Sequence, residues 1–113
     1  MAVKHEVFEG IAVVTIDGEL ADEAVAEARE AVVARVERDG LRQIVVDLSA
    51  CTSIASTGLE CLLHAASLCE DRRGRLKLAG CEAYLLKILA ITRLRSRFEC
   101  SDNLETALRS LRV

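Results

Sequence analysis

Two short runs that contain residues favoured in strands, near the start of the printed sequence, predict a pair of strands. They cover residues 3–8 and 11–16, and only Glu9 and Gly10 separate them. A two-residue connection that includes glycine is typical of a hairpin, because glycine readily adopts the positive φ angles of tight turns. Asp17 and Gly18 follow, and we expect them to end the second strand.

A longer segment with a helical repeat comes next. Valine or alanine recurs at three- and four-residue steps between residues 22 and 38, with glutamates at other positions. This spacing gives a helix one apolar face and one charged face. Gly40 closes the helix, and Ile44, Val45 and Val46 then form an apolar run without polar alternation. Such a run is typical of a central strand that is covered on both faces or by its neighbours.

The stretch after this strand predicts a loop over residues 49–55 and then a second amphipathic helix that ends at Gly74. Its expected inner face comprises Leu59, Leu62, Leu63, Ala66 and Cys69, and its polar stripe comprises Glu60, His64, Ser67 and Asp71. Strands at 76–79 and 98–100 then alternate with helices at 82–91 and 103–112. Asp102 or Asn103 is the expected cap of the last helix.

The predicted element order is ββαβαβαβα, which favours an α/β fold. Alternating strands and helices imply right-handed crossovers and parallel pairing after the opening hairpin. We therefore expect a mixed five-stranded sheet packed against about four helices, in a single domain over residues 1–113. The central strand and second helix carry the largest apolar faces, so their residues should be buried together. This set comprises Ile44, Val45, Val46, Leu59, Leu62, Leu63 and Leu76.

Composition narrows the classes of function. Hydrophobic residues make up 51% of the 113 residues, which is enough for one core without metals or disulfides. A net charge of −3 and 3% aromatic residues give neither a general basic field nor a set of stacking residues for nucleic acid. No apolar run is long enough to span a membrane, and the first residues do not resemble a signal peptide. We expect a cytoplasmic protein that neither binds nucleic acid nor inserts into a membrane.

The cysteines do not form a recognisable framework. They are Cys51, Cys61, Cys69, Cys81 and Cys100. Their spacing is irregular and contains no CxxC pair, and His5 and His64 are not placed to complete a zinc site. We expect all five to stay reduced, mostly as small buried side chains, and we expect no metal and no cofactor.

An enzyme would need a nucleophile, a base and an orienting group. Cys51 or Cys61 with His64 is the nearest candidate pair, but His64 lies on the polar stripe of its predicted helix and no third group is evident. A solvated surface histidine explains that position better. The sequence therefore favours a protein that is not an enzyme.

The most informative segment is VDLSACTSIASTGL, residues 46–59. It resembles the signature of the STAS domain family, whose bacterial members are anti-sigma factor antagonists. In that signature a strand ends in Asp-Leu-Ser, and a short loop leads to an apolar residue, Asp, Ser, Ser or Thr, Gly and Leu at the start of a helix. The matching residues here are Ile54, Ala55, Ser56, Thr57, Gly58 and Leu59. Further matches are Gly18-Glu19-Leu20, Gly74, Leu94 and Ala107-Leu108.

The resemblance implies a STAS fold and a phosphorylation switch. Ser56 matches the serine that a cognate anti-sigma factor, itself a serine kinase, phosphorylates, and Thr57 is the second choice. A serine phosphatase is a further implied partner. Phosphate at a helix start meets unpaired N–H groups and the positive end of the helix dipole, yet it changes the surface that a partner meets. The expected partner surface comprises Ser53, Ile54, Ala55, Ser56, Thr57, Gly58 and Glu60.

Capping and phosphorylation are both compatible with this helix start. Thr57 and Glu60 have capping-box spacing, which predicts Thr57 as the N-cap and leaves Ser56 one residue outside the helix. Two residues depart from the family's pattern: Ala55 replaces the acidic residue before the phosphoacceptor, and Arg93 stands where a glycine is common.

Two interpretations remain open at other points. Arg93, Arg95 and Arg97 form either a solvated face or a contact for an acidic partner or phosphate. The helix start, followed by Leu62-Leu63-His64, is also similar to STAS subunits that dock on the ATPase of phospholipid-transporting ABC systems. The sequence leaves the oligomeric state open.

Overall fold

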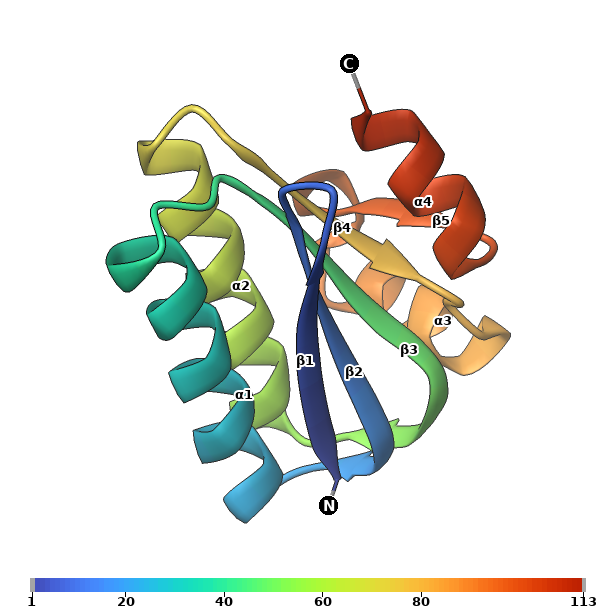
Figure 1. Ribbon diagram of the computed structural model, residues 1–113. Coiled ribbons are helices and arrows are strands. Elements are labelled where there is room, and N and C mark those ends of the chain that lie inside the picture. Colours follow the sequence, from blue (N-terminus) through green and yellow to red (C-terminus); the bar gives the residue numbers. More distant parts are fainter. Residues whose placement is uncertain (1, 113) are drawn as a thin grey trace.

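The computed structural model describes residues 2–112 and contains one five-stranded sheet in the order β1-β2-β3-β4-β5 (Figure 1). Its strands are β1 (Val3–Phe8), β2 (Ile11–Leu20), β3 (Gln43–Ile54), β4 (Arg75–Ala79) and β5 (Glu99–Ser101). β1 pairs with β2 in the antiparallel sense, and every later pair is parallel. The predicted mixed five-stranded sheet is therefore confirmed.

The opening hairpin turns through the two residues that the sequence indicated. Glu9 and Gly10 have φ angles of 51° and 80°. Positive φ at both central residues is the geometry of the two-residue turn that matches the natural twist of paired strands. Glycine makes the second of these angles accessible without a Cβ clash.

β2 and β3 are longer than predicted. β2 continues past Asp17 and Gly18 to Leu20, and β3 includes most of the segment expected to be a loop. The two extensions pair with each other, ending with Leu20 beside Ile54, and two register shifts accommodate the irregular stretch. Pairing between distant segments supplies the backbone hydrogen bonds, so local polarity and glycine content did not reveal these strand ends. The predictions of a strand ending at Asp17 and of a loop over 49–55 were wrong.

Four α-helices lie where the periodicity predicted them: α1 (Glu23–Val33), α2 (Ser56–Asp71), α3 (Ala83–Ile91) and α4 (Leu104–Leu111). A π-helical turn, η1 (Ala34–Arg38), extends α1 to the predicted end, and a short 3₁₀ turn, η2 (Arg95–Arg97), follows α3. At α4 the Thr106 N–H donates to Asn103 Oδ1 at 2.8 Å, so Asn103 is the cap.

The core has two parts, one on each face of the sheet. Ile44 and Val46 belong to the larger part, which also contains buried residues of α1, α2 and α3. Val45 belongs to a smaller part with Ala107 and Leu111 of α4. Successive side chains of a strand point to opposite faces, which places Val45 away from its two neighbours. The expectation of one common buried set was therefore wrong for Val45, and Leu59 and Leu63 are only partly buried at the edge of the larger part.

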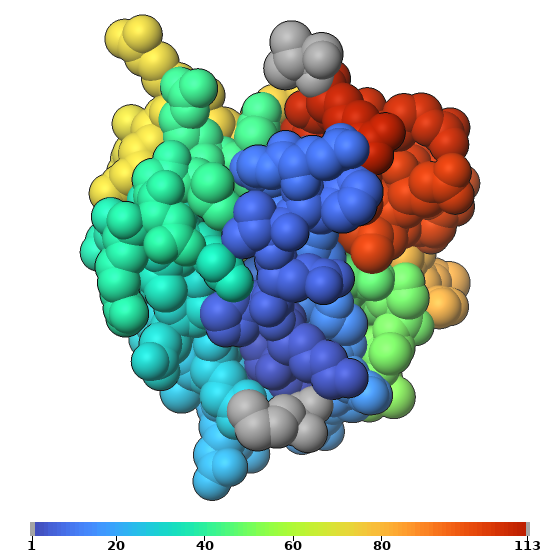
Figure 2. Space-filling model, viewed as in Figure 1, coloured from blue at the N-terminus to red at the C-terminus, as the bar shows by residue number. Residues whose placement is uncertain are grey.

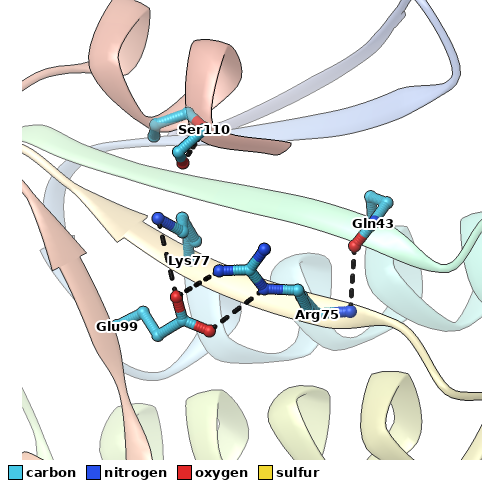
Figure 3. A network of polar contacts seen from close by, with 6 residues as sticks. Gln43, Arg75, Lys77, Glu99 and Ser110 are labelled. Atoms are coloured by element: carbon cyan, nitrogen blue, oxygen red, sulfur yellow. Dashed lines mark hydrogen bonds and ion pairs between the residues drawn. The ribbon is translucent and has the colours of Figure 1, made fainter. Parts of the chain in front are cut away.

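A polar network lies on the α4 side of the sheet (Figure 3). Lys77 pairs in register with Val45 and is only 9% exposed. Its Nζ lies 3.5 Å from Glu99 Oε2, and Arg75 Nε donates to Glu99 Oε1 at 3.2 Å. The hydrogen bond from Arg75 lowers the pKa of Glu99, and the charges of Arg75 and Lys77 act in the same direction. Glu99 thus gives the largely buried Lys77 a partner charge.

The end of α4 also contacts the tip of the hairpin. Arg112 Nε lies 2.8 Å from Glu9 Oε2, and its guanidinium carbon lies 5.6 Å from the centre of the Phe8 ring. Figure 2 shows the hairpin in blue beside the red C-terminal helix. These contacts hold the first and last described elements together.

Candidate functional site

The predicted site lies where β2 and β3 end and where α1 and α2 begin, at the lower end of Figure 1. Ala55 is the single residue between β3 and α2, and its backbone is extended. Its N–H donates to the Leu20 carbonyl at 3.1 Å, while its own carbonyl accepts from the Leu59 N–H at 3.0 Å. These two hydrogen bonds fix the start of α2 against the end of β2.

Gly58 permits a close approach at the same point. A Cβ on this residue would lie 2.6 Å from the Leu20 carbonyl oxygen and 2.9 Å from Leu20 Cγ. Both distances are shorter than a carbon atom tolerates, so any larger residue would push the first turn of α2 away from β2. Gly58 itself is buried, and its contribution to the site is this packing.

Ser56 is the first residue of α2, and both Ser56 and Thr57 are exposed. Ala55 occupies the N-cap position and offers no side-chain oxygen. The prediction that Thr57 caps the helix and leaves Ser56 outside it was therefore wrong. The hydrogen bond between Ala55 and Leu20 sets the start of the helix, and sequence spacing alone does not contain that long-range contact.

The first turn of α2 has unused donors. Among residues 2–112, no acceptor meets the backbone N–H groups of Ser56 or Thr57. The first N–H groups of any helix lack intrahelical partners and lie at the positive end of its dipole. An anionic group on the Ser56 side chain would lie next to these donors.

The remaining predicted partner residues lie close to this turn. Ser53 and Ile54 end β3 and are partly exposed, whereas Glu60 is exposed one helical turn after Ser56. The Ser53 hydroxyl donates to Glu19 Oε2 at 3.1 Å. Through this contact Glu19 lies at the candidate site. We did not predict it as a site residue, because β2 was expected to end at Asp17 and Gly18. Its place in the Gly18-Glu19-Leu20 match was the one available signal.

α3 also braces this end of the sheet. The Tyr84 hydroxyl donates to the Cys51 carbonyl at 2.8 Å. Burial is the main reason that the pKa of Tyr84 is raised, and the side chain of Cys51 adds to the effect. Tyr84 was not among the predicted site residues, because its contact joins segments far apart in the sequence.

The profile of the STAS domain matches residues 2–107. This chain belongs to the STAS domain family. The match covers the candidate site together with nearly all of the sheet. A search of curated proteins found no match to the chain.

Solved structures have the same STAS fold. A Thermotoga maritima protein described as a candidate anti-sigma factor antagonist is 18% identical, with a TM-score of 0.88 over 98% of this chain and 95% of that one. An anti-sigma factor antagonist from Mycobacterium paratuberculosis is 27% identical, with a TM-score of 0.79 over 98% and 93% of the two chains. The phosphorylated form of Bacillus SpoIIAA is 20% identical, with a TM-score of 0.81 over 98% and 100%.

The two departures from the STAS pattern have structural consequences. Ala55 takes the N-cap position, where an acidic side chain could accept from the unused N–H groups of α2. Arg93 has a φ of 62° immediately after α3. Its N–H and that of Leu94 donate back to Ala90 and Leu89, which is the helix ending that favours glycine.

The histidine and cysteines that formed the nearest candidate catalytic pair differ in their surroundings. His64 is exposed, whereas Cys61 is buried and burial raises the pKa of its thiol. The Cys51 thiol donates to the Ser53 carbonyl at 3.3 Å. In the described part of the chain, no group of three His, Cys, Asp or Glu residues is placed to hold a metal ion. The described helices include none long and apolar enough to cross a membrane.

Of the arginine cluster, Arg97 contacts α2. One terminal nitrogen of Arg97 lies 3.4 Å from the Ser67 hydroxyl and 3.5 Å from Glu70 Oε1. Arg93 and Arg95 are exposed. One member of the cluster therefore links η2 to α2. The contact lies near the end of α2, whereas Ser56 lies at its start.

Proposed function

We propose that this STAS domain is an anti-sigma factor antagonist that binds an anti-sigma factor serine kinase and is released when that kinase phosphorylates Ser56. It acts by binding rather than catalysis, works in the cytoplasm as one domain and so regulates transcription. A serine phosphatase restores the binding form. The observation that carries this proposal is the exposed Ser56 hydroxyl at the first position of α2, on a backbone anchored to Leu20.

A phosphate at Ser56 would alter the surface with little effect on the fold. Negative charge at a helix N-terminus is stabilising by about 0.3–1 kcal/mol. Glu60 lies four residues later on the same helical face, and a like-charge pair at this spacing costs about 0.2–0.5 kcal/mol. These two contributions nearly cancel. The partner, in contrast, would meet about 1.5 to 2 additional negative charges in the middle of its contact surface.

The proposed partner surface contains Ser53, Ile54, Ala55, Ser56, Thr57 and Glu60. Gly58 is buried beneath these residues and allows α2 to pack closely on β2. These residues share one end of the molecule. Several proteins of the same fold are named as anti-sigma factor antagonists, which supports the proposed class of partner.

Affinity capture from the native host tests the class of partner. The bait is the tagged chain with Ser56→Ala, which cannot be phosphorylated at that residue, and the matched control is Ser56→Asp. We expect mass spectrometry to identify a kinase-type anti-sigma factor that is enriched by Ser56→Ala and depleted by Ser56→Asp. Equal enrichment by both baits of the ATPase of a phospholipid-transporting ABC system would contradict the proposal.

A further inference from the structure

Cys81 and Cys100 are far apart in the sequence but meet at the edge of the sheet. Cys100 lies in β5 beside Leu78 of β4. The Gly80 N–H donates to the Ser101 carbonyl at 3.0 Å, so each cysteine is the chain neighbour of one member of a hydrogen-bonded pair. Both side chains pack against the larger part of the core, and each is the main cause of the other's pKa shift.

The turn that brings Cys81 to this position is fixed by packing. Gly80 has a φ of 71°, and a Cβ on it would lie 2.8 Å from the Ser49 backbone nitrogen. The chain can therefore bend here only because residue 80 has no side chain. The pairing of the two thiols follows from the fold and does not depend on a flexible loop.

The two cysteines also differ from the others in exposure. Cys51, Cys61 and Cys69 are buried, whereas Cys81 and Cys100 are partly exposed. All five are free thiols in the structure. A small oxidant in solution can reach the pair more readily than it can reach the three buried thiols.

The interaction between the two thiols shifts their pKa values in opposite directions. The hydrogen bond from the Cys81 thiol lowers the pKa of Cys100 to about 7, and Arg95 acts in the same direction against burial. The same hydrogen bond is the main reason that the pKa of Cys81 is raised, and burial adds to it. The thiolate, which is the form that reacts with peroxides, is therefore favoured on Cys100 over Cys81.

We propose that Cys81 and Cys100 form a reversible intramolecular disulfide when the protein meets a hydroperoxide. The Cys100 thiolate attacks the peroxide, forming an S–O bond and breaking the O–O bond; the released hydroxide, or alkoxide, takes up a proton. The Cys81 thiol then attacks the sulfenic acid sulfur, forming the S–S bond, and the departing oxygen leaves as water with the thiol proton. The peroxide gains the two electrons that the two sulfurs lose. Two molecules of a small thiol can then reduce the protein disulfide by exchange, and they leave joined by a disulfide of their own.

This inference stands independently of the proposed phosphorylation switch. It concerns β4, β5 and the start of α3 rather than the first turn of α2. A disulfide here would join the segment before α3 to the edge strand. The resting protein keeps both thiols reduced, so the inference adds an oxidised state to the reduced one expected from the sequence.

Oxidation of the reduced 113-residue chain by a small excess of hydrogen peroxide tests the proposal. We expect intact mass spectrometry to show a monomer that has lost two hydrogen atoms, and peptide mapping to join Cys81 to Cys100. Dithiothreitol should restore the starting mass. A disulfide between chains, oxidation spread over all five cysteines, or a pair that remains reduced while other residues oxidise would overturn the proposal.

Three variants separate the roles, with circular dichroism confirming that each is folded. Cys81→Ser should accumulate a sulfenic acid at Cys100 that dimedone traps, and Cys100→Ser should react at least tenfold more slowly with peroxide. Cys69→Ser is the matched control and should form the disulfide at the wild-type rate. Iodoacetamide labelling of the wild-type protein at neutral pH needs no variant and should modify Cys100 first. Preferential labelling of any buried cysteine would contradict the assigned nucleophile.

Discussion

This chain departs from the STAS pattern at two single residues, each at the end of a helix. Ala55 places a methyl group where an N-cap side chain would accept a hydrogen bond, so the first turn of α2 keeps unused donors. Arg93 holds a backbone angle that L-residues with a Cβ rarely adopt. One substitution at each position should stabilise its helix end: an added carboxylate at residue 55, and removal of the side chain at residue 93.

Ala55→Asp should stabilise the protein by about 0.5–2 kcal/mol, because the carboxylate can accept from an N–H of the first turn of α2. Urea unfolding at neutral pH measures this difference. Thr57→Ala is the matched control and should change the free energy of unfolding by less than about 0.5 kcal/mol. A large loss in Thr57→Ala with no gain in Ala55→Asp would show that Thr57 is the cap after all.

Arg93→Gly should raise the free energy of unfolding by about 0.5–1 kcal/mol, since glycine adopts a φ of 62° without a Cβ penalty. Lys87 is exposed in the interior of α3, where a change to glycine should have the opposite effect on stability. Lys87→Gly should lower the free energy of unfolding by roughly 1 kcal/mol, because glycine is unfavourable inside a helix. Thermal unfolding distinguishes the two signs, and a loss of stability in Arg93→Gly would contradict the assigned helix ending.

At the scale of the elements, apolar patterns and turn residues predicted the α-helices and strands of the described part of the chain, because these patterns record which side of an element is buried. They did not predict the short turn η2. The ends of the elements were less predictable where distant contacts decide them. β3 extends to Ile54 because it pairs with β2, and α2 starts at Ser56 because Ala55 is hydrogen-bonded to Leu20. For the same reason the sequence predicted Ser56 and its neighbours in the site, but not Glu19 or Tyr84. A match to a family signature identifies positions, whereas contacts between segments require the fold.

Gly58→Ala tests the close packing of α2 on β2. The added Cβ would meet the Leu20 carbonyl oxygen at 2.6 Å, and backbone cannot move aside as a side chain can. Overpacking of this kind costs about 1–3 kcal/mol, of which alanine's helix propensity returns up to about 1 kcal/mol. We expect a net loss of stability in chemical unfolding. Alanine is already accepted at a buried position later in α2, Ala65, so the expected loss is specific to the contact with Leu20. A Gly58→Ala variant as stable as wild type would show that α2 tolerates displacement from β2.

At the scale of the whole molecule, α4 covers one face of the sheet while α1, α2 and α3 pack on the other. Lys77 lies on the α4 side, and its burial requires a partner charge, which Glu99 provides. Protonation of Glu99 in acid would remove this partner charge and so lower stability. The sequence predicted the last helix but not that Lys77 would be buried near it.

Glu99→Gln should reduce stability at neutral pH and weaken its dependence on acid. The pKa of Glu99 is lowered in the folded protein, so its contribution is complete above its ordinary pKa of about 4.3 and disappears as the pH falls through the folded value. The difference in free energy of unfolding between wild type and variant should therefore shrink as the pH is lowered from about 6 to about 3, a range that includes this ordinary pKa. Glu105→Gln, which removes an exposed ion pair with Arg109, should cost at most about 0.5 kcal/mol at neutral pH. A pH-independent difference for Glu99→Gln would contradict the assigned charge interaction.

The most direct test of the switch is the affinity of the captured anti-sigma factor kinase for the unmodified protein and for the protein phosphorylated at Ser56, measured by calorimetry. We expect phosphorylation and Ser56→Asp to weaken binding at least tenfold, which corresponds to about 1.4 kcal/mol, with little change in melting temperature. Ser56→Ala should bind as wild type and lose regulation by ATP. Glu105→Gln on α4, outside the proposed partner surface, should bind and respond as wild type. Equal affinity of the phosphorylated and unmodified proteins would contradict a switch at Ser56.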